Sequence, residues 1–370
     1  MKGGEEMRAF LQELCEDFAA NGNFSGVCLL KRENELIFEK AYGFANRAFR
    51  VPNRADTRFD TASVTKIFTA AAVLQLAEQG RLGLSDRITA LVDLSGTKIP
   101  EDVTIEQLLN HTSGIADDAD EVAGESYAAL FADSPNYVIR ECRDFLKNFA
   151  WKEPVFPAGT AARYCNCSYV LLGMAVEAVS GENYRDYYRK HIFEPAGMTR
   201  TAFLSMEEVN ENTAEGYENV QDEAGRFMGY RKNIYSFPPR GTPDGGAYTT
   251  AGDLCRFFEA VREERILGRS YADSFLRPHC SFTSPEPRLG LPGLYAQNGY
   301  GLEFLMLPGR ETPFCIGKDG LNPGVCAYAT YYPQNHITLV LLANQDCNVW
   351  EMTRRVQREM LRQNWLDSRL

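Results

Sequence analysis

Two apolar runs near the end of the chain decide the fold: Val325-Cys326-Ala327-Tyr328-Ala329-Thr330-Tyr331-Tyr332 and His336-Ile337-Thr338-Leu339-Val340-Leu341-Leu342-Ala343-Asn344. Both are rich in β-branched and aromatic residues, which favour strands. The break between them, Pro333-Gln334-Asn335, is typical of a turn. The pattern therefore predicts an antiparallel hairpin, and a helix is expected after it over residues 349–365.

The start of the chain carries the same two kinds of element in the opposite order. Apolar residues at helical spacing predict a helix over residues 5–21, which Asn21-Gly22-Asn23 ends. Two β-rich runs, residues 26–30 and 35–42, flank a polar turn and predict a second hairpin. A hairpin at each end of the chain predicts one antiparallel sheet flanked by the terminal helices.

The middle of the chain is mixed and largely helical. Its helical patterns fall in four stretches, residues 63–79, 137–149, 168–179 and 251–264. We therefore expect an α+β fold with a mainly antiparallel sheet built from residues 1–60 and 290–370. Residues 61–289 are expected to form a mostly helical insertion.

Composition excludes several kinds of partner. The 370 residues are 44% apolar, which is ordinary for a globular protein. The 39 Lys and Arg against 50 Asp and Glu give a net charge of −11, which repels a phosphate backbone, so no nucleic acid partner is expected. The best apolar runs, such as residues 337–343, are far shorter than the roughly 20 residues that span a membrane, so no membrane partner is expected.

The cysteines and the first residues bear on location and metal binding. Residues 1–24 carry acidic residues instead of a basic stretch followed by an apolar one, so no signal peptide is expected. We expect a cytoplasmic protein whose ten cysteines are reduced, although a chain trimmed of its leader would give the same pattern. No pair of C-x-x-C motifs is present, so no metal site is expected.

Common catalytic motifs are absent from the sequence: there is no G-x-S-x-G, no phosphate-binding G-x-x-x-x-G-K-[ST] and no H-E-x-x-H. Asp117, Asp118 and Asp120 are interpreted as a solvated acidic loop. Few residues could serve as the base of a Ser-His-Asp triad, because the chain has only four histidines, His111, His191, His279 and His336. A serine activated by a lysine remains.

Ser63-Val64-Thr65-Lys66 opens the amphipathic pattern over residues 63–79. One helical turn between the serine and the lysine puts the hydroxyl and the amine on the same face, where the amine can take the hydroxyl proton. A second match, Ser95-Gly96-Thr97-Lys98, contains a glycine and is followed by Pro100, which disfavours a helix. Ser63 is therefore the preferred nucleophile; the alternative is that Lys66 is a surface lysine.

A tyrosine could assist such a serine. Its phenol has a pKa of about 10, so it acts as a base near neutral pH only where cations favour the ionised form. Tyr164-Cys165-Asn166 is followed directly by an apolar helical pattern that can anchor it, whereas Tyr217-Glu218-Asn219 lies in a polar stretch that is typical of a solvated hairpin. Lys318, in Gly317-Lys318-Asp319-Gly320, could project from a strand as the second cation, or it could be a turn lysine.

In this order, Ser63-x-x-Lys66, Tyr164-x-Asn166 and Lys318-x-Gly320 resemble the three motifs of the serine β-lactamase and penicillin-binding-protein superfamily, in its class C-like branch. That branch also contains D,D-peptidases, D-aminopeptidases and esterases. The resemblance covers residues 24 to 345 and implies a β-lactamase/transpeptidase-like fold without a metal or organic cofactor. It also implies that the active site lies at the junction of the sheet and the helical insertion. Four connecting segments match as well, residues 108–114, 193–198, 245–254 and 299–302.

The resemblance also implies roles for the motif residues. Ser63 would be the acylated nucleophile, and Lys66 and Tyr164 would share the proton transfers of acylation and deacylation. Asn166 would hydrogen-bond the substrate and Lys66. Lys318 would support the charge of Tyr164 or bind a substrate carboxylate.

The third motif carries the oxyanion hole and two departures from the family pattern. The backbone N–H groups of Ser63 and Leu321, the residue after Gly320, would bind the oxyanion. Asp319 stands where lactam-binding members have a hydroxyl residue, and its charge would repel a substrate carboxylate if it faced the site. Leu321 is bulkier than the small residue common there, and both departures favour an esterase or amide hydrolase over a β-lactamase.

The expected function is thus a serine hydrolase that acts through a Ser63 acyl-enzyme on a small ester or amide. A D-amino-acid peptidase or amidase, a D,D-carboxypeptidase and a true class C β-lactamase stay open. A non-catalytic penicillin-binding-like scaffold is the alternative from another class, and it predicts a lost motif residue. Small-molecule esters, amides or lactams are the expected partners, the oligomeric state is not predicted, and oxidation of Cys165 or Cys167 beside Asn166 is expected to inactivate the enzyme.

Overall fold

The computed structural model describes residues 2–120, 123–281 and 294–366. An eight-stranded sheet with the order β2-β1-β14-β13-β12-β11-β10-β9 lies at its centre, and every neighbouring pair is antiparallel. The strands are β1 (Gly26–Arg32), β2 (Glu35–Tyr42), β9 (Cys280–Ser281), β10 (Tyr295–Asn298), β11 (Glu303–Met306), β12 (Cys315–Asn322), β13 (Val325–Tyr332) and β14 (Ile337–Ala343).

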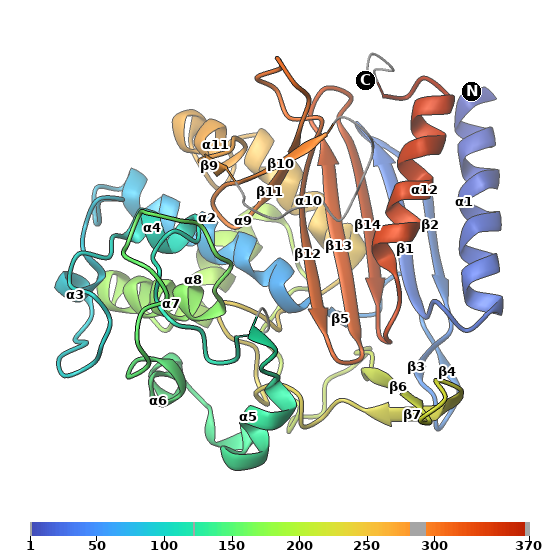
Figure 1. Cartoon of the computed structure of the whole chain (residues 1–370). Coiled ribbons are helices and arrows are strands. Elements are labelled where there is room, and N and C mark those ends of the chain that lie inside the picture. The colour runs from blue at the N-terminus through green and yellow to red at the C-terminus, as the bar shows by residue number, and fades with distance from the viewer. Residues whose placement is uncertain (1, 121–122, 282–293, 367–370) are drawn as a thin grey trace.

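The two ends of the chain meet in this sheet. β1 pairs with β14 from Gly26 opposite Ala343 to Arg32 opposite Ile337, so both predicted hairpins join one sheet. The terminal helices α1 (Lys2–Ala20) and α12 (Val349–Arg362) lie side by side on one face, as Figure 1 shows. The α+β fold with a mainly antiparallel sheet and flanking terminal helices is confirmed.

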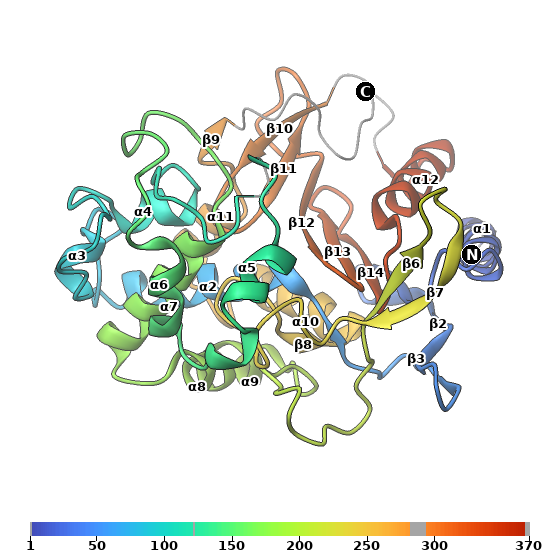
Figure 2. The same cartoon turned by 60° about the horizontal axis from the view of Figure 1, so that its bottom comes forward.

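Helices cover the opposite face, and most of them gather beyond one edge of the sheet (Figure 2). α10 (Ala251–Arg262) packs on β1 and β14, although its residues belong to the predicted insertion. The division into residues 1–60, 61–289 and 290–370 stays a prediction, and its boundary at 289/290 lies outside the described residues. None of the helices in the described part of the chain is long and apolar enough to cross a bilayer.

α2 (Lys66–Glu78) is the central helix, and the 3₁₀ turn η1 (Ala62–Thr65) leads into it. The prediction that it is amphipathic is wrong, because every residue from Lys66 to Ala77 is buried. α2 contacts α7 (Asn166–Ser180) on one side and α11 (Arg269–Phe275) on another. Its apolar residues outside the predicted stripe, Phe68 and Val73 among them, are buried as well.

The predicted helix over residues 137–149 is also wrong: three short turns replace it, η3 (Asn136–Val138), η4 (Cys142–Phe145) and α6 (Leu146–Phe149). The Asp144 carboxylate accepts the backbone N–H groups of Arg140 and Glu141, and this local cap starts a new turn. The hairpin expected at Tyr217 is confirmed as β6 and β7. The remaining elements are β3 (Phe44–Asn46), β4 (Val51–Pro52), β5 (Phe59–Asp60), α3 (Ile88–Leu91), α4 (Ile105–Leu109), α5 (Tyr127–Asp133), η3 (Asn136–Val138), η4 (Cys142–Phe145), α6 (Leu146–Phe149), α8 (Tyr184–Tyr188), η5 (Arg189–Phe193), α9 (Glu194–Ala196), β6 (Tyr217–Gln221), β7 (Phe227–Lys232) and β8 (Tyr248–Thr249).

Candidate active site

A tight turn after β5 presents Ser63 at the start of α2. Ala62 has a φ of 44°, a left-handed conformation that is costly for a residue with a side chain. Two hydrogen bonds hold it: the Ala62 N–H donates to Asp60 Oδ1 at 2.7 Å, and Thr65 Oγ1 donates to the Ala62 carbonyl at 2.7 Å. The strained turn therefore fixes the direction of the Ser63 side chain.

Asp60, which holds this turn, is buried, and burial raises its pKa from 3.8 to about 6. A carboxyl whose pKa is higher in the folded state than in the unfolded one opposes folding as the pH rises through that window. Asp60→Asn keeps an oxygen for the Ala62 N–H and removes the charge. We expect the variant to exceed the wild type in free energy of unfolding by about 1–3 kcal/mol near pH 8 and to lose that advantage near pH 4. Denaturant unfolding at the two pH values measures the difference, and a more stable wild type near pH 8 would contradict the prediction.

The Ser63 hydroxyl accepts two hydrogen bonds from the predicted motif residues. Lys66 Nζ donates to Ser63 Oγ at 3.0 Å and the Tyr164 hydroxyl donates to it at 2.7 Å. Lys66 Nζ also donates to Asn166 Oδ1 at 2.8 Å and to the Asp244 backbone carbonyl at 2.6 Å. Lys66 is fully buried, so the surface-lysine alternative is wrong. These bonds bring the serine, lysine, tyrosine and asparagine of the first two motifs together.

Asp117 fixes the start of α7, where the second motif lies. Its carboxylate accepts the backbone N–H groups of Asn166 at 3.0 Å and Cys167 at 2.9 Å, as a helix N-cap does. The interpretation of Asp117, Asp118 and Asp120 as a solvated loop is wrong: Asp118 is buried, and Asp120 pairs with Arg163. The sequence held no local signal for the cap, because the capped residues lie about 50 positions away.

His111 supports Tyr164 from behind. Its ring centre lies 4.7 Å from that of Tyr164, and its Nδ1 accepts the Cys165 N–H at 3.2 Å. Burial, together with the charges of Lys66 and Lys318, holds the pKa of His111 well below its usual value, so the ring is neutral. In the sequence His111 was noted as one of four histidines and within the matching segment 108–114, and its contact with Tyr164 was not predicted.

Lys318 approaches Tyr164 from the sheet. It lies within β12, so the turn-lysine alternative is wrong, and its Nζ is 5.0 Å from the centre of the Tyr164 ring. The same Nζ donates to Glu303 Oε1 at 2.9 Å and to Asp319 Oδ1 at 3.1 Å. Burial by itself would lower the pKa of Lys318, but the two carboxylates outweigh it and raise that pKa.

Gly320 brings β12 against the serine turn. A Cβ at this position would lie 2.1 Å from the Thr61 carbonyl oxygen and 3.0 Å from the Ser63 nitrogen, so only glycine fits. Leu321 is 52% exposed and lines the pocket in front of Ser63. The Asp319 carboxylate is buried and accepts the indole N–H of Trp350 at 2.9 Å, which turns it toward α12 and away from the substrate pocket. Asp319 was predicted to repel a substrate carboxylate only if it faced the site. Because it does not face the site, that repulsion is not expected.

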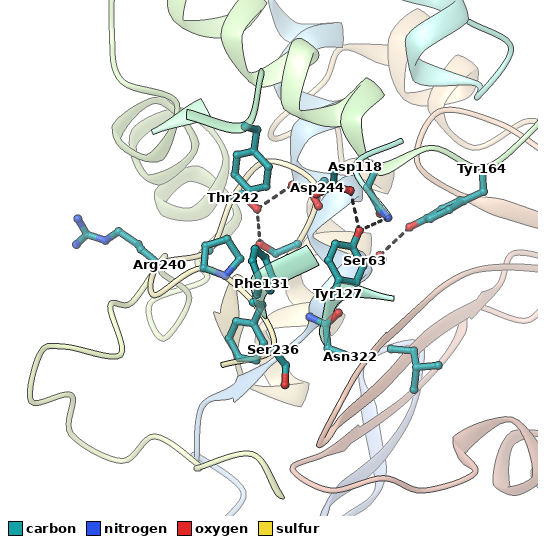
Figure 3. A pocket seen from close by; sticks show the side chains of 18 residues that line it. Ser63, Asp118, Tyr127, Phe131, Tyr164, Ser236, Arg240, Thr242, Asp244 and Asn322 are labelled. Carbon is teal, nitrogen blue, oxygen red and sulfur yellow. Dashed lines mark hydrogen bonds between the residues drawn. The ribbon is translucent and has the colours of Figure 1, made fainter. Parts of the chain in front are cut away.

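The pocket that exposes Ser63 has a volume of about 630 Å³, including space open to solvent. Figure 3 shows Ser63 and Tyr164 on one side of it, with Asp118, Tyr127 and Asp244 beside them. Residues of the loop 236–246 and the aromatic side chains of Phe131 and Phe145 also line it. The pocket can thus hold a small molecule against the serine hydroxyl.

Asp117, Asp118 and Cys167 are the group whose donor atoms could come together around a metal, since these atoms lie within 4.8 Å of one another. Both carboxylate oxygens of Asp117 already accept helix N–H groups. Burial raises the pKa of the Cys167 thiol well above its usual value, which disfavours the thiolate that a metal needs. This donor set fits protein hydrogen bonds better than a metal, and we assign no metal to it.

Cys165 and Cys167 are both buried, and burial raises the pKa of each thiol well above its usual value. Only the thiolate reacts readily with peroxide, so the structure contradicts the expected inactivation by oxidation. Brief treatment with dilute peroxide is expected to leave hydrolytic activity and both thiols unchanged. Activity assays with peptide mass spectrometry test this, and lost activity together with oxidised Cys165 or Cys167 would disprove it.

Comparisons with known proteins agree on one family and one fold. Residues 11–362 match the sequence model of the Beta-lactamase family. Penicillin-binding protein 4* of Bacillus subtilis is 26% identical over 365 residues, which cover 92% of this chain and 73% of that protein. The crystal structure of a penicillin binding protein from Bacillus halodurans is similar with a TM-score of 0.84 at 33% identity, covering 94% of this chain and 99% of that one. D-amino acid amidase from Ochrobactrum anthropi SV3 shares the fold, with a TM-score of 0.73 at 23% identity over 96% of this chain and 99% of the amidase.

Proposed function

The chain belongs to the Beta-lactamase family of serine hydrolases, and from this premise we propose that it hydrolyses small esters or amides through an acyl-enzyme on Ser63. The observation that carries the proposal is the pair of hydrogen bonds that Ser63 Oγ accepts from Tyr164 at 2.7 Å and Lys66 at 3.0 Å, at the wall of an open pocket. A nucleophile in contact with two proton-transfer groups is the arrangement that acyl transfer requires.

Acylation starts from Tyr164 as a phenolate, with the proton of the 2.7 Å hydrogen bond on Ser63 Oγ. Ser63 Oγ attacks the substrate carbonyl as this proton passes to Tyr164 of the Tyr164–Lys66 pair. The bond to the leaving group then breaks, and the departing oxygen or nitrogen takes that proton, which leaves an ester on Ser63. In deacylation a water attacks the same carbonyl and gives its proton to the pair. The proton returns to Ser63 Oγ as the carboxylic acid product forms.

Lys66 and Tyr164 have different places in these transfers. Lys66 Nζ donates to three acceptors, Ser63 Oγ, Asn166 Oδ1 and the Asp244 carbonyl, which uses all three N–H bonds of an ammonium. That arrangement supports Tyr164 as the group that first takes the serine proton. Lys66 and Lys318 lie 4.9 and 5.0 Å from the Tyr164 ring centre, where both cations stabilise negative charge that develops on the phenol.

The strand register supports the predicted oxyanion hole. Asn322 pairs with Val325 across the two-residue turn Pro323-Gly324, and hydrogen bonds alternate along an antiparallel ladder. The N–H of Leu321, one residue earlier, therefore points away from β13 and toward the edge where η1 lies. Gly320 allows this edge to approach the Ser63 nitrogen, so we assign the two N–H groups to the substrate oxyanion.

For Lys318 we propose support of Tyr164 rather than capture of a substrate carboxylate, because Glu303 and Asp319 already compensate its charge. A bulky, half-exposed Leu321 at the pocket mouth further favours open-chain esters and amides over lactams. A D-amino-acid amidase or peptidase, a D,D-carboxypeptidase and a class C β-lactamase remain alternatives within the same chemistry. The scaffold alternative expects a lost motif residue, and each motif side chain is present and in contact.

A substrate panel tests the proposal. Purified enzyme is assayed with a chromogenic aryl ester, anilides of D- and L-amino acids, a peptide ending in two D-alanines and a chromogenic lactam. We expect turnover of the ester or of an anilide, with slower or no turnover of the lactam. Hydrolysis of the lactam alone would replace the proposal by the β-lactamase alternative, and release of terminal D-alanine alone would replace it by the carboxypeptidase.

A further inference from the structure

We propose that the pocket beside Ser63 selects substrates whose acyl part carries an ammonium group, and that the Asp118 carboxylate is the residue that binds it. The inference deepens the proposed function, on which it rests, by naming a substrate class. It is carried by one buried carboxylate, the fixed path of contacts that joins it to the nucleophile, and the charges around the pocket.

Asp118 is 3% exposed and lines the same pocket as Ser63, as Figure 3 shows. Its Oδ1 accepts the Ala119 N–H at 2.9 Å and the Tyr127 hydroxyl at 3.1 Å. Its Oδ2 accepts no hydrogen bond from any residue in the described ranges. Asp118 lines the pocket, and its Oδ2 is not one of the fully buried unpaired atoms of the described residues, so this oxygen is open to the pocket, where a ligand can donate to it.

Hydrogen bonds connect this carboxylate to the reacting serine. The Tyr127 hydroxyl that donates to Asp118 accepts the Asn166 Nδ2–H at 2.9 Å. The other end of the same amide, Asn166 Oδ1, accepts from Lys66, which reaches Ser63. Asp118 is therefore held in a fixed position relative to the nucleophile, as a residue that orients substrates must be.

Two aspartates without a cationic partner among the described residues line the pocket, so its charge disfavours a substrate that carries a carboxylate. Asp244 lines the pocket with Asp118, and its Oδ1 accepts from Thr242 at 2.8 Å. Neither aspartate forms an ion pair with the residues that the structure describes. Burial, with added repulsion from Asp117 and Asp244, raises the pKa of Asp118 to about 7. The shift shows that no cation in the described part of the chain compensates the charge of this carboxylate.

The cations near the pocket already bind other acceptors and do not compensate Asp118. Lys66 donates to three acceptors, and Lys318 pairs with Glu303 and Asp319. Arg240 also lines the pocket, but its Nε donates to the Phe203 carbonyl, and in Figure 3 its guanidinium points away from Asp118. An ammonium would therefore find an uncompensated carboxylate here, and a substrate carboxylate would be repelled.

We place the acyl part of the substrate, and not its leaving group, against Asp118. The leaving group must depart to solvent after the first step, whereas the acyl part stays on Ser63 until water releases it. Tyr127 and Phe131 line the pocket together with Asp118, and their stacked rings, with centres 6.0 Å apart, provide an apolar wall for the carbon chain between the carbonyl and the ammonium. A group recognised there remains bound through both steps.

The test uses anilides that share one chromogenic leaving group and differ in the acyl part. For each of several short chain lengths, three substrates are compared: one that ends in an ammonium, one in an uncharged group of the same size and one in a carboxylate. For at least one length we expect kcat/KM of the ammonium substrate to exceed that of its uncharged counterpart at least about tenfold. The carboxylate is expected to be the poorest of the three.

Asp118→Asn keeps the shape of the side chain and removes its charge, so the ratio between ammonium and uncharged substrates is expected to fall to within about threefold of unity. Asp133→Asn is the matched control, because Asp133 is an exposed aspartate on α5, the helix that begins with Tyr127. It removes the same charge outside the pocket and is expected to leave the ratio unchanged. A wild-type ratio near unity at every length, or a high ratio that survives in Asp118→Asn, would overturn the proposal.

Binding to Ser63→Ala tests the same claim without turnover. By calorimetry, an ammonium-bearing amide is expected to bind at least about tenfold more tightly than its uncharged counterpart, and the added Asp118→Asn change is expected to abolish that difference. Equal binding of the two amides would overturn the proposal, whether or not the wild type hydrolyses them. Labelling of Ser63 by a fluorophosphonate separately reports whether the hydrolase assignment stands.

Discussion

Ser63→Ala is expected to lower kcat/KM for ester or amide hydrolysis by about 10⁴-fold or more, while the protein stays folded. The substitution removes one oxygen, the atom that attacks the carbonyl. Lys66 keeps its bonds to Asn166 and to the Asp244 carbonyl, so its charge remains solvated within the site. The loss is therefore expected in the chemical step, and it is measured as kcat/KM on the best substrate of the panel, with circular dichroism and thermal unfolding as the measures of folding.

The chain offers a matched control in its second Ser-x-x-Lys sequence. Ser95 is exposed and lies in a loop, where its N–H donates to Asp93. Ser95→Ala is expected to leave kcat/KM unchanged. If Ser63→Ala retained the activity of the wild type, or if Ser95→Ala lost it, the assignment of the nucleophile would be wrong.

Gly320→Ala is expected to lower kcat/KM at least about 100-fold and to reduce thermal stability. The new Cβ would lie 2.1 Å from the Thr61 carbonyl oxygen and 3.0 Å from the Ser63 nitrogen, and neither backbone atom can rotate away. Either β12 or η1 must shift, which displaces the serine and both proposed oxyanion donors together. A misplacement of about 1 Å is enough to cost about 100-fold in rate.

Gly252→Ala provides the comparison for this substitution. Gly252 lies in α10, and a Cβ there would meet Arg256 Nη1 at 3.6 Å and Thr250 Oγ1 at 4.0 Å, both ordinary contacts with side-chain atoms. Gly252 is the second residue of the helix, where the interior preference for alanine of about 1 kcal/mol does not apply in full, so this variant is expected to be about as stable as the wild type, with unchanged kcat/KM. Kinetics and thermal melts of the two alanine variants decide the matter: full activity in Gly320→Ala would mean that the close approach of β12 to Ser63 has no role in catalysis.

The parts of the structure that could be predicted from the sequence are those that local pattern determines. The runs that became β13 and β14 carry their strand preference in every residue, and their turn holds a proline, so the hairpin was predicted almost to the residue. The first motif was also readable, because Ser63 and Lys66 are one turn apart on a helix with a strong apolar pattern. The second and third motifs needed the resemblance to connect residues more than 100 positions apart in the chain.

What could not be predicted depends on packing between distant segments. The pattern of α2 indicated one buried stripe, but helices on several sides bury the whole helix, and periodicity does not report how many neighbours a helix has. Asp117 and Asp118 looked like solvent-exposed charges because the partners that bury them, α7 and Tyr127, lie elsewhere in the sequence. His111 gained its place beside Tyr164 in the same way.

The central claim is that Ser63 is a nucleophile activated by its contacts with Tyr164 and Lys66. Intact-mass spectrometry after reaction with a fluorophosphonate tests it most directly, because the serine oxygen displaces fluoride and keeps the phosphonyl group. We predict a single adduct on the wild type, mapped to the peptide that contains Ser63, and no adduct on Ser63→Ala. An unlabelled wild type, or equal labelling of the wild type and Ser63→Ala, would contradict the claim.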